Sequence, residues 1–333
     1  MNTKKIFTTA VCFLYSLVFL TLASAQEKQV TNRYAMKLKD KGDGTYELLY
    51  GYKYARFIDL SKLDDLLVPY EHQNDKLTGK LYNKIETEVV TYKKHEGYEL
   101  QIAIDRATGD SPAPVMFYCH GGGWARGNFE ASRSLSKYMA QQHGITGVRV
   151  SYTLAPQDGA NVEVSIQDVL DAVKFIRENA SKYNIDPSRI GFLGTSAGAH
   201  LAACAAMKTD DAKVFVGYSG IYDLTTAAIT TRTKDEQRKA YFFNLDPSAL
   251  AKASPALMLS KKKKIDALIV CGTADCTVEC SQSENFAAAL DALKGSSAQL
   301  LEYPYYDHNL TSKSSDKMEE IFFKTADFIA AHL

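Results

Sequence analysis

The sequence predicts an α/β protein built on a mostly parallel β-sheet with helices on both faces. From about Ile85 onward, short apolar runs with strand character alternate with longer segments that have helical periodicity. This alternation is typical of a parallel sheet, because each crossover between parallel strands needs a long connection, usually a helix. Right-handed crossovers place the carboxyl ends of the strands at one edge, where the sites of open α/β sheets collect.

The predicted strands are short apolar runs bounded by polar or glycine-containing segments. In chain order they are Ile85–Tyr92, Tyr98–Asp105, Val115–Cys119, Gly147–Tyr152, Arg189–Leu193, Val214–Tyr218, Ala267–Cys271 and Leu300–Tyr303. The first two are expected to pair with each other. The third is apolar throughout, which indicates a strand that is buried on both faces.

The predicted helices alternate with these strands and carry apolar residues three and four positions apart. In chain order they are Glu130–His143, Val162–Tyr183, Ala197–Met207, Cys276–Leu293 and Lys317–His332. The second is the longest and places Ile166, Val169 and Val173 on one stripe, so this stripe is expected to face the core.

Two segments stand outside this alternation. Residues 26–84 are rich in Tyr and Lys and have no clear period, so we treat them as an N-terminal extension of unclear structure. Residues 221–264 contain the polar stretch Thr230–Lys239 and the aromatic trio Tyr241–Phe243. An insertion at this place suits a small lid, and an ordinary crossover with a long loop is the alternative. The main domain is therefore predicted over residues 85–333.

The first 25 residues have the features of a secretory signal peptide. Lys4 and Lys5 precede the uncharged apolar run Ile6–Leu22, and Ala23-Ser24-Ala25 has the form of a cleavage site. A signal anchor is the alternative, but the run is short for a bilayer and ends in small residues. No later segment of the sequence is apolar enough to span a membrane. We expect a secreted or periplasmic protein with no stable membrane insertion after cleavage.

The overall composition favours ordinary globular packing. Apolar residues make up 46% and charged residues 23% of the chain, which excludes a disordered or fibrous protein. The 39 Lys and Arg residues equal the 39 Asp and Glu residues in number. Because no basic excess is left to neutralise a phosphate backbone, nucleic acid is not an expected partner.

Five cysteines follow the apolar N-terminal run, so at least one thiol stays free in a monomer. Cys119, Cys204 and Cys271 are expected as buried core residues. Cys276 and Cys280 are the only close pair. A disulfide between them suits an oxidising compartment, whereas a regular helix would aim the two β-carbons poorly, so both states stay open. Zinc is not expected, because no histidines stand nearby at ligand spacing.

The clearest chemical signal is Gly194-Thr195-Ser196-Ala197-Gly198, which lies directly between a predicted strand and a predicted helix. A serine on a sharp strand-to-helix turn exposes its hydroxyl at the edge of the sheet, and the flanking glycines permit the tight backbone. The peptide N–H of Ala197 then lies at a helix start, aimed where negative charge could form. This setting predicts Ser196 as a nucleophile.

A second signal is His120-Gly121-Gly122-Gly123-Trp124, at the end of an earlier strand. Three glycines free the backbone to point successive N–H groups into one cavity, as in the second half of an oxyanion hole. A glycine-rich phosphate loop is the alternative, but neither Gly-Lys-Ser/Thr nor Gly-x-Gly-x-x-Gly spacing is present. His120 is expected to shape this loop rather than to act as a base.

Ser196 needs a base that is held in one tautomer by a carboxylate. Asp275 follows the strand Ala267–Cys271, and His308 follows the last strand, so both lie at carboxyl ends of strands. The order Ser196, Asp275, His308 is that of an α/β-hydrolase triad. The other histidines fit worse, with His200 expected as a packed structural residue, and Glu279 and Asp307 are weaker candidates for the acid.

From about Ile85 to its end, the chain resembles α/β-hydrolases of the hormone-sensitive-lipase-like carboxylesterase group. The oxyanion loop, the following strand, the nucleophile elbow and the acid turn carry the resemblance: His120–Trp124, Val148–Pro156, Gly194–His200 and Gly272–Val278. Within that group the chain is most similar to secreted bacterial feruloyl and acetyl-xylan esterases, whose elbow also reads Ser-Ala-Gly-x-His. The resemblance implies an α/β-hydrolase catalytic domain over residues 85–333 and oxyanion donors at Gly122, Gly123 and Ala197. Thr153 and Ala199 depart from the common arginine and glycine of the group.

The motifs and the resemblance together predict a secreted serine esterase that acts through an acyl-enzyme and needs no metal or organic cofactor. The expected partner is a small-molecule or polysaccharide-linked ester with a short or aromatic acyl group, such as acetyl or feruloyl groups on plant polysaccharide. Trp124 is expected to floor the acyl pocket, and packing in the core beneath the loop is its alternative role.

Two other functions compete with this prediction. A serine peptidase of the prolyl-oligopeptidase type would share the fold and the triad order, but it usually carries an additional glycine in the elbow and a large N-terminal propeller. A catalytically inactive, hydrolase-like binding module is disfavoured by the intact set of Ser196, Asp275 and His308.

Overall fold

A computed structural model describes residues 38–40, 46–48, 84–226, 233, 235–273, 275, 277–303, 306–310 and 315–333. Within the predicted extension, the short strands β1 (Leu38–Asp40) and β2 (Tyr46–Leu48) form an antiparallel pair. The predicted signal peptide lies outside the described residues. No helix among the described residues is long and apolar enough to cross a membrane.

The centre of the protein is an eight-stranded sheet in the order β10-β9-β8-β7-β5-β6-β4-β3. The strands are β3 (Thr87–His95), β4 (Tyr98–Asp105), β5 (Ala113–Cys119), β6 (Thr146–Val150), β7 (Ile185–Thr195), β8 (Ala212–Tyr218), β9 (Asp266–Gly272) and β10 (Ser297–Tyr303). The β3–β4 and β4–β6 pairs are antiparallel, and all other neighbours are parallel. The mostly parallel sheet predicted from the alternating pattern is confirmed.

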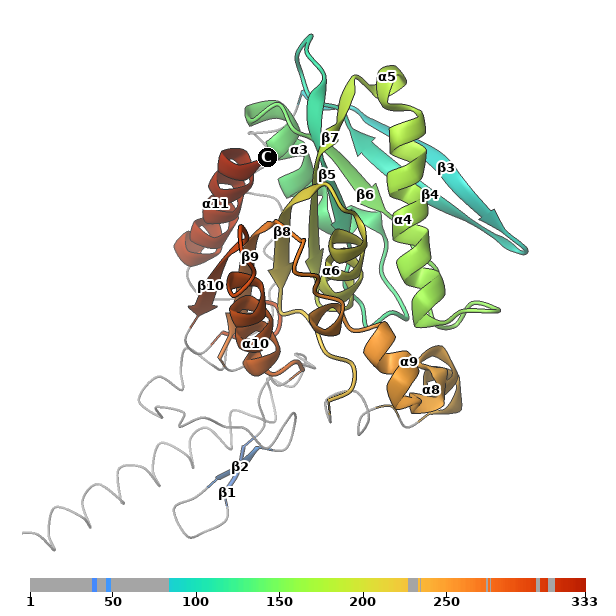
Figure 1. Cartoon of the computed structure of the whole chain (residues 1–333), viewed down its shortest axis with the longest axis vertical. Coiled ribbons are helices and arrows are strands. Elements are labelled where there is room, and N and C mark those ends of the chain that lie inside the picture. The colour runs from blue at the N-terminus through green and yellow to red at the C-terminus, as the bar shows by residue number, and fades with distance from the viewer. Residues whose placement is uncertain are drawn as a thin grey trace, which may run out of the picture.

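Helices cover both faces of this sheet (Figure 1). On one face lie α3 (Arg133–Gln142) and α11 (Ser315–His332), and on the other lie α4 (Val162–Glu178), α6 (Ala197–Lys208) and α10 (Cys280–Asp291). The central strand β5 shows why both faces need cover. Its side chains alternate, so that Phe117 packs into one apolar core and Tyr118 into the other.

The helix boundaries depart from the sequence prediction where side chains bond to the backbone. The predicted helix Val162–Tyr183 is interrupted at Asn179, whose amide donates to the carbonyl of Phe175 at 2.8 Å, and continues as the single turn α5 (Ala180–Tyr183). The predicted helix Cys276–Leu293 begins only at Cys280, because the preceding residues form the turn around Asp275 that is described below.

The insertion between β8 and β9 contains the short helices α8 (Glu236–Tyr241), η3 (Phe243–Leu245), α9 (Pro247–Lys252) and η4 (Pro255–Leu257). Asp235 and Asp246 accept hydrogen bonds from main-chain N–H groups at the starts of α8 and α9. Tyr241 and Phe242 are buried in the main core. The described part of the predicted lid is thus a helical crossover packed against the main core, whereas residues 227–232 and 234 lie outside the described residues.

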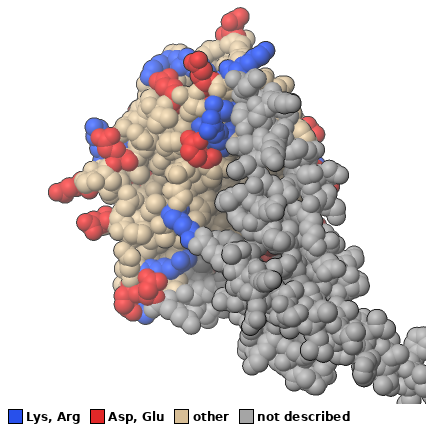
Figure 2. Space-filling model, turned by 180° about the vertical axis from the view of Figure 1, so that it is seen from behind, with Lys and Arg blue, Asp and Glu red and all other residues tan. Residues whose placement is uncertain are grey.

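The face shown in Figure 2 carries basic and acidic side chains interspersed with each other around a broad area that has neither. This mixture agrees with the equal numbers of basic and acidic residues in the whole chain.

Candidate active site

Ser196 occupies a sharp turn between β7 and α6. Its backbone angles are φ 55° and ψ −122°, a conformation that costs free energy and persists only where the surroundings enforce it. Close packing provides that enforcement. A β-carbon at Gly194 would overlap the backbone of Gly198, and one at Gly198 would overlap the carbonyl oxygens of Cys119 and His120. The glycines of the motif therefore let the serine turn sit directly against the end of β5.

The three predicted triad residues are brought together in one chain of hydrogen bonds. His308 Nε2 lies 2.9 Å from Ser196 Oγ, and His308 Nδ1 lies 2.7 Å from Asp275 Oδ2. Because an ionised carboxylate only accepts hydrogen bonds, Nδ1–H donates to Asp275. The neutral imidazole then has its free lone pair on Nε2, where it accepts the hydroxyl proton of Ser196. This is the tautomer that a serine nucleophile requires.

Asp275 is held by the turn that carries it. Its Oδ1 accepts hydrogen bonds from the N–H groups of Thr277 (2.7 Å) and Val278 (2.8 Å), while Oδ2 faces the histidine. The side chain is only 1% exposed. The weaker acid candidates have other contacts, since Glu279 accepts from the Ser281 hydroxyl and Asp307 from the N–H of Asn309. The geometry therefore selects Asp275 among the three carboxylates.

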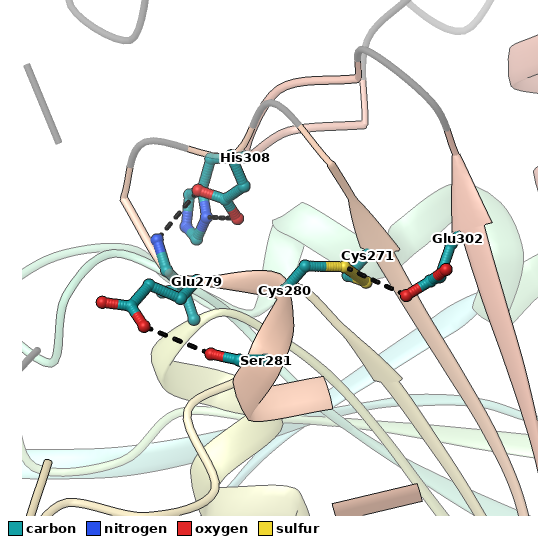
Figure 3. The surroundings of a disulfide bond; sticks show 8 residues. Cys271, Glu279, Cys280, Ser281, Glu302 and His308 are labelled. Carbon is teal, nitrogen blue, oxygen red and sulfur yellow. Dashed lines mark hydrogen bonds and ion pairs between the residues drawn. A yellow bond between two sulfur atoms is a disulfide. The ribbon is translucent and has the colours of Figure 1, made fainter. Parts of the chain in front are cut away.

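A disulfide joins the two ends of the segment that contains this turn. Cys271, the penultimate residue of β9, is bonded to Cys280, the first residue of α10, with a Cα–Cα distance of 5.6 Å (Figure 3). Cys280 is therefore not paired with Cys276, the disulfide that the sequence left open. Cys271 is buried, as predicted, and it is also the partner of Cys280. The late start of α10 turns Cys280 toward the end of β9. Cys276 lies outside the described residues, and Cys119 and Cys204 are free and buried.

The disulfide lies beside a carboxylate. Glu302 Oε1 is 3.9 Å from the sulfur of Cys280 (Figure 3). Two sulfurs and a carboxylate at this spacing could in principle hold a metal ion. Sulfurs that are bonded to each other are not thiolates, however, so this cluster is not a metal site in the oxidised protein.

The glycine loop lies against the serine turn. Gly122, Gly123 and Trp124 have successive positive φ angles of 121°, 62° and 58°. At Gly121, a β-carbon would lie 3.0 Å from the carbonyl oxygen of Thr195 and 3.5 Å from Cβ of Ser196. The loop thus places Gly121, the residue before the predicted oxyanion donors Gly122 and Gly123, against the serine turn, and Ala197 begins α6 directly after Ser196.

The sequence around these residues matches a known protein family. A profile of the BD-FAE family matches residues 100–290, which covers the glycine loop, the serine turn and Asp275. The chain belongs to the BD-FAE family.

Solved structures similar to this BD-FAE protein share its fold. The propionate-bound esterase Est2 from the Planctomycetes species Thermogutta terrifontis has a TM-score of 0.60 and 22% identity, with 72% of this chain and 92% of that chain covered. The esterase LipW from Mycobacterium marinum has a TM-score of 0.62 and 21% identity, with 77% and 85% covered. The predicted α/β-hydrolase fold is confirmed.

His120 supports the glycine loop of this BD-FAE protein. Its Nδ1–H donates to the carbonyl of Gly121 at 2.8 Å, and its ring stacks on Tyr152 at 4.3 Å. The Tyr152 hydroxyl donates to the carbonyl of His120 at 2.7 Å. Burial lowers the pKa of His120, so the ring stays neutral. As the sequence predicted, this histidine shapes the loop.

Trp124 requires a correction. The side chain is 2% exposed and belongs to the main apolar core, so it has almost no surface to offer a substrate. Its Nε1–H donates to Nδ1 of His200 at 3.3 Å, and Nε2–H of His200 donates to the carbonyl of Ala253 at 2.7 Å. Burial lowers the pKa of His200 to about 4. Trp124 and His200 therefore brace the loop and the serine helix from the core side.

A cavity of about 300 Å³ borders the histidine of the triad. Thr195, Tyr218 and His308 form its wall toward the site, and apolar side chains including Leu135 and Phe322 line the rest. The volume is at the small end of the range for ligand sites. The sequence did not predict this cavity. It forms where α3 and α11 meet over the sheet, and a contact between such distant segments cannot be recognised from a local sequence pattern.

Proposed function

We propose that the protein is a serine carboxylic ester hydrolase. One observation carries the proposal, namely the continuous hydrogen-bond chain from Ser196 through His308 to Asp275, with distances of 2.9 and 2.7 Å. Membership of the BD-FAE family and the esterase names of the structural neighbours support it.

The mechanism follows from the positions of the atoms. His308 Nε2 takes the Ser196 proton as Oγ attacks the ester carbonyl, and Asp275 stabilises the imidazolium that forms. The N–H groups of Gly122, Gly123 and Ala197 stabilise the negative charge on the carbonyl oxygen. The imidazolium then gives its proton to the departing alcohol, which leaves an acyl-enzyme. Water, deprotonated by His308, releases the acid.

We propose that the substrates carry short or aromatic acyl groups, with acetyl and feruloyl groups on plant polysaccharide as specific candidates. The small cavity beside His308 supports this proposal. So do the propionate and the butyrate bound to the structurally similar Est2 of Thermogutta terrifontis. Long acyl chains would need more apolar space than such a cavity offers.

We also propose that the protein is exported, and that the mature chain begins at Gln26 in the periplasm or outside the cell. A disulfide beside the triad favours an oxidising compartment. N-terminal sequencing of protein recovered from a secreting host tests this proposal, and a membrane-embedded product that begins at Met1 would contradict it.

The decisive experiment compares the wild type with Ser196→Ala on a panel of substrates. The panel runs from p-nitrophenyl acetate to long-chain esters and includes methyl ferulate, acetylated xylan and aminoacyl anilides. We expect kcat/KM to be highest for short or aromatic esters, and the variant to lose at least about 10³-fold while it keeps its melting temperature. Preferred cleavage of the anilides would indicate a peptidase, and equal turnover by both proteins would overturn the assignment.

A further inference from the structure

One polar side chain on the cavity beside the triad has unused hydrogen-bonding capacity. Asn309 lines this cavity together with the preceding residue, His308. The Nδ2 atom of Asn309 is buried and has no hydrogen-bond partner among the described residues. No other residue of the cavity wall has a buried side-chain nitrogen or oxygen without a partner, within the part of the chain that the structure describes. Because buried polar groups are nearly always paired, a ligand group in the cavity is a natural partner for this amide.

The backbone holds Asn309 close to the reacting atoms. Its N–H donates to Asp307 Oδ1 at 3.0 Å, and the N–H of Leu310 donates to the Asp307 carbonyl at 3.0 Å. His308 Nε2 lies 2.9 Å from Ser196 Oγ. The scissile carbonyl of an ester must reach this Oγ atom, so a group that fills the cavity beside His308 is part of the same ester.

Apolar side chains, including Leu135, Leu310 and Phe322, form much of the cavity wall. Tyr218 also lines the cavity, but its hydroxyl is hydrogen-bonded to the Thr325 hydroxyl on α11. The volume of about 300 Å³ is small for a ligand site. The cavity therefore suits a short carbon chain that carries a polar atom for the Asn309 amide.

The amide of Asn309 can pair with more than one kind of oxygen. A carboxamide donates through its NH₂ group and accepts through its oxygen, and a half-turn about the Cβ–Cγ bond exchanges the two with little change in shape. An ether oxygen accepts from the NH₂ group, and a hydroxyl group can also donate to the amide oxygen. A plain alkyl chain of the same length leaves the amide unpaired, so the site discriminates against it.

We infer that Asn309 is a specificity-determining residue that hydrogen-bonds an ether or hydroxyl oxygen on the acyl group held in the cavity. The inference rests on the proposed esterase function and adds a substrate class to it, namely esters of short alkoxy and hydroxy acids.

The test uses two pairs of esters in which an ether oxygen replaces a CH₂ group. For the acyl side, 4-nitrophenyl methoxyacetate is compared with 4-nitrophenyl butanoate. For the alcohol side, 2-methoxyethyl acetate is compared with butyl acetate. The kcat/KM of each ester is measured for the wild type, Asn309→Leu, Asn309→Ala and the control Tyr218→Phe, which removes a hydroxyl that is already paired within the protein. Each variant is compared with the wild type on the same ester, so differences in intrinsic reactivity cancel.

We expect Asn309→Leu to lower kcat/KM about 3- to 30-fold for the methoxyacetate ester, and to leave the butanoate ester unchanged or slightly faster. Asn309→Ala should show the same preference, because it also lacks the amide. Tyr218→Phe should change the two members of each pair by the same factor. An equal loss on the methoxyacetate and butanoate esters would overturn the inference, because it would mean that Asn309 only supports His308. A loss confined to the alcohol-side pair would overturn the assignment to the acyl group.

Stability and binding test the inference without turnover. Because Nδ2 of Asn309 has no partner among the described residues, neither substitution should lower the melting temperature. A fall of several degrees in both variants would show that the amide has a structural role, and would overturn the inference. In the Ser196→Ala background, ligand-observed NMR should show methyl methoxyacetate binding more tightly than methyl butanoate, and Asn309→Leu should abolish the difference. Equal binding of the two compounds would refute the inference even if no ester were hydrolysed. The expected difference in binding without any hydrolysis would refute the esterase proposal alone.

Discussion

Replacement of Asp275 by Asn tests the central hydrogen-bond chain without removing an atom. The N–H groups of Thr277 and Val278 both donate to Oδ1, so they require an oxygen at that position. The new amide must therefore place its NH₂ group opposite His308 Nδ1, where the carboxylate oxygen stood at 2.7 Å. An NH₂ group donates to Nδ1 and drives the ring proton to Nε2. Nε2 then cannot accept the Ser196 proton.

The expected cost is large for turnover and small for folding. A base held in the wrong tautomer lowers kcat by about 10⁴-fold, which corresponds to about 5 kcal/mol of transition-state stabilisation. The turn keeps all its hydrogen bonds, so the free energy of unfolding should change by about 1 kcal/mol or less.

The kcat and the melting temperature are measured for Asp275→Asn and for a matched alanine variant. Initial rates with p-nitrophenyl acetate give kcat, and calorimetry gives the melting temperature. Asp275→Ala is the matched variant, because it leaves the two N–H donors of the turn without an acceptor and should lose about 2–4 kcal/mol of stability as well as turnover. Retention of more than a tenth of the wild-type kcat by Asp275→Asn would refute the tautomer argument. A fall in its melting temperature as large as that of the alanine variant would refute the account of the turn.

Three further predictions concern stability. Burial lowers the pKa of His200 to about 4, so the unfolded chain binds a proton that the folded chain rejects. Denaturation curves should show stability rising from about pH 4 to pH 6.5, and His200→Gln should flatten this slope. A methyl group at residue 198 would overlap the carbonyl oxygens of Cys119 and His120, so Gly198→Ala should cost about 3 kcal/mol or more, and an unchanged melting temperature would contradict the packing described. The disulfide closes a loop with a sequence separation of 9 and should contribute about 3 kcal/mol, which dithiothreitol should remove. Cys276→Ala is the control, because it should leave that effect of dithiothreitol intact.

The sequence predicted the elements whose signals are local. The alternating pattern predicted the parallel sheet, and the glycines around Ser196 predicted the sharp turn, because a small set of adjacent residues determines each. The order of Ser196, Asp275 and His308 also identified the three side chains that the structure brings within hydrogen-bonding distance.

What the sequence did not predict depends on contacts between distant segments. The pairing of Cys271 with Cys280 depends on where α10 begins, and the turn around Asp275 delays that start. The buried position of Trp124 depends on Phe242, which reaches it from the insertion. Neither the periodicity nor the motifs of a single sequence predict which distant residues come into contact.

The disulfide around Asp275 has a consequence for the preparation of the protein. Burial raises the pKa of Cys119 to about 12 and also raises the pKa of Cys204, so neither thiol supplies the thiolate that exchange reactions need. Air oxidation of folded, reduced material should therefore leave these two residues untouched, whereas Cys271 and Cys280 can form the disulfide described above. A batch produced in a reducing cytosol would contain molecules with and without the cross-link, and its heat inactivation would be biphasic. Specific activities from different production hosts are comparable only after the thiols of each batch have been titrated.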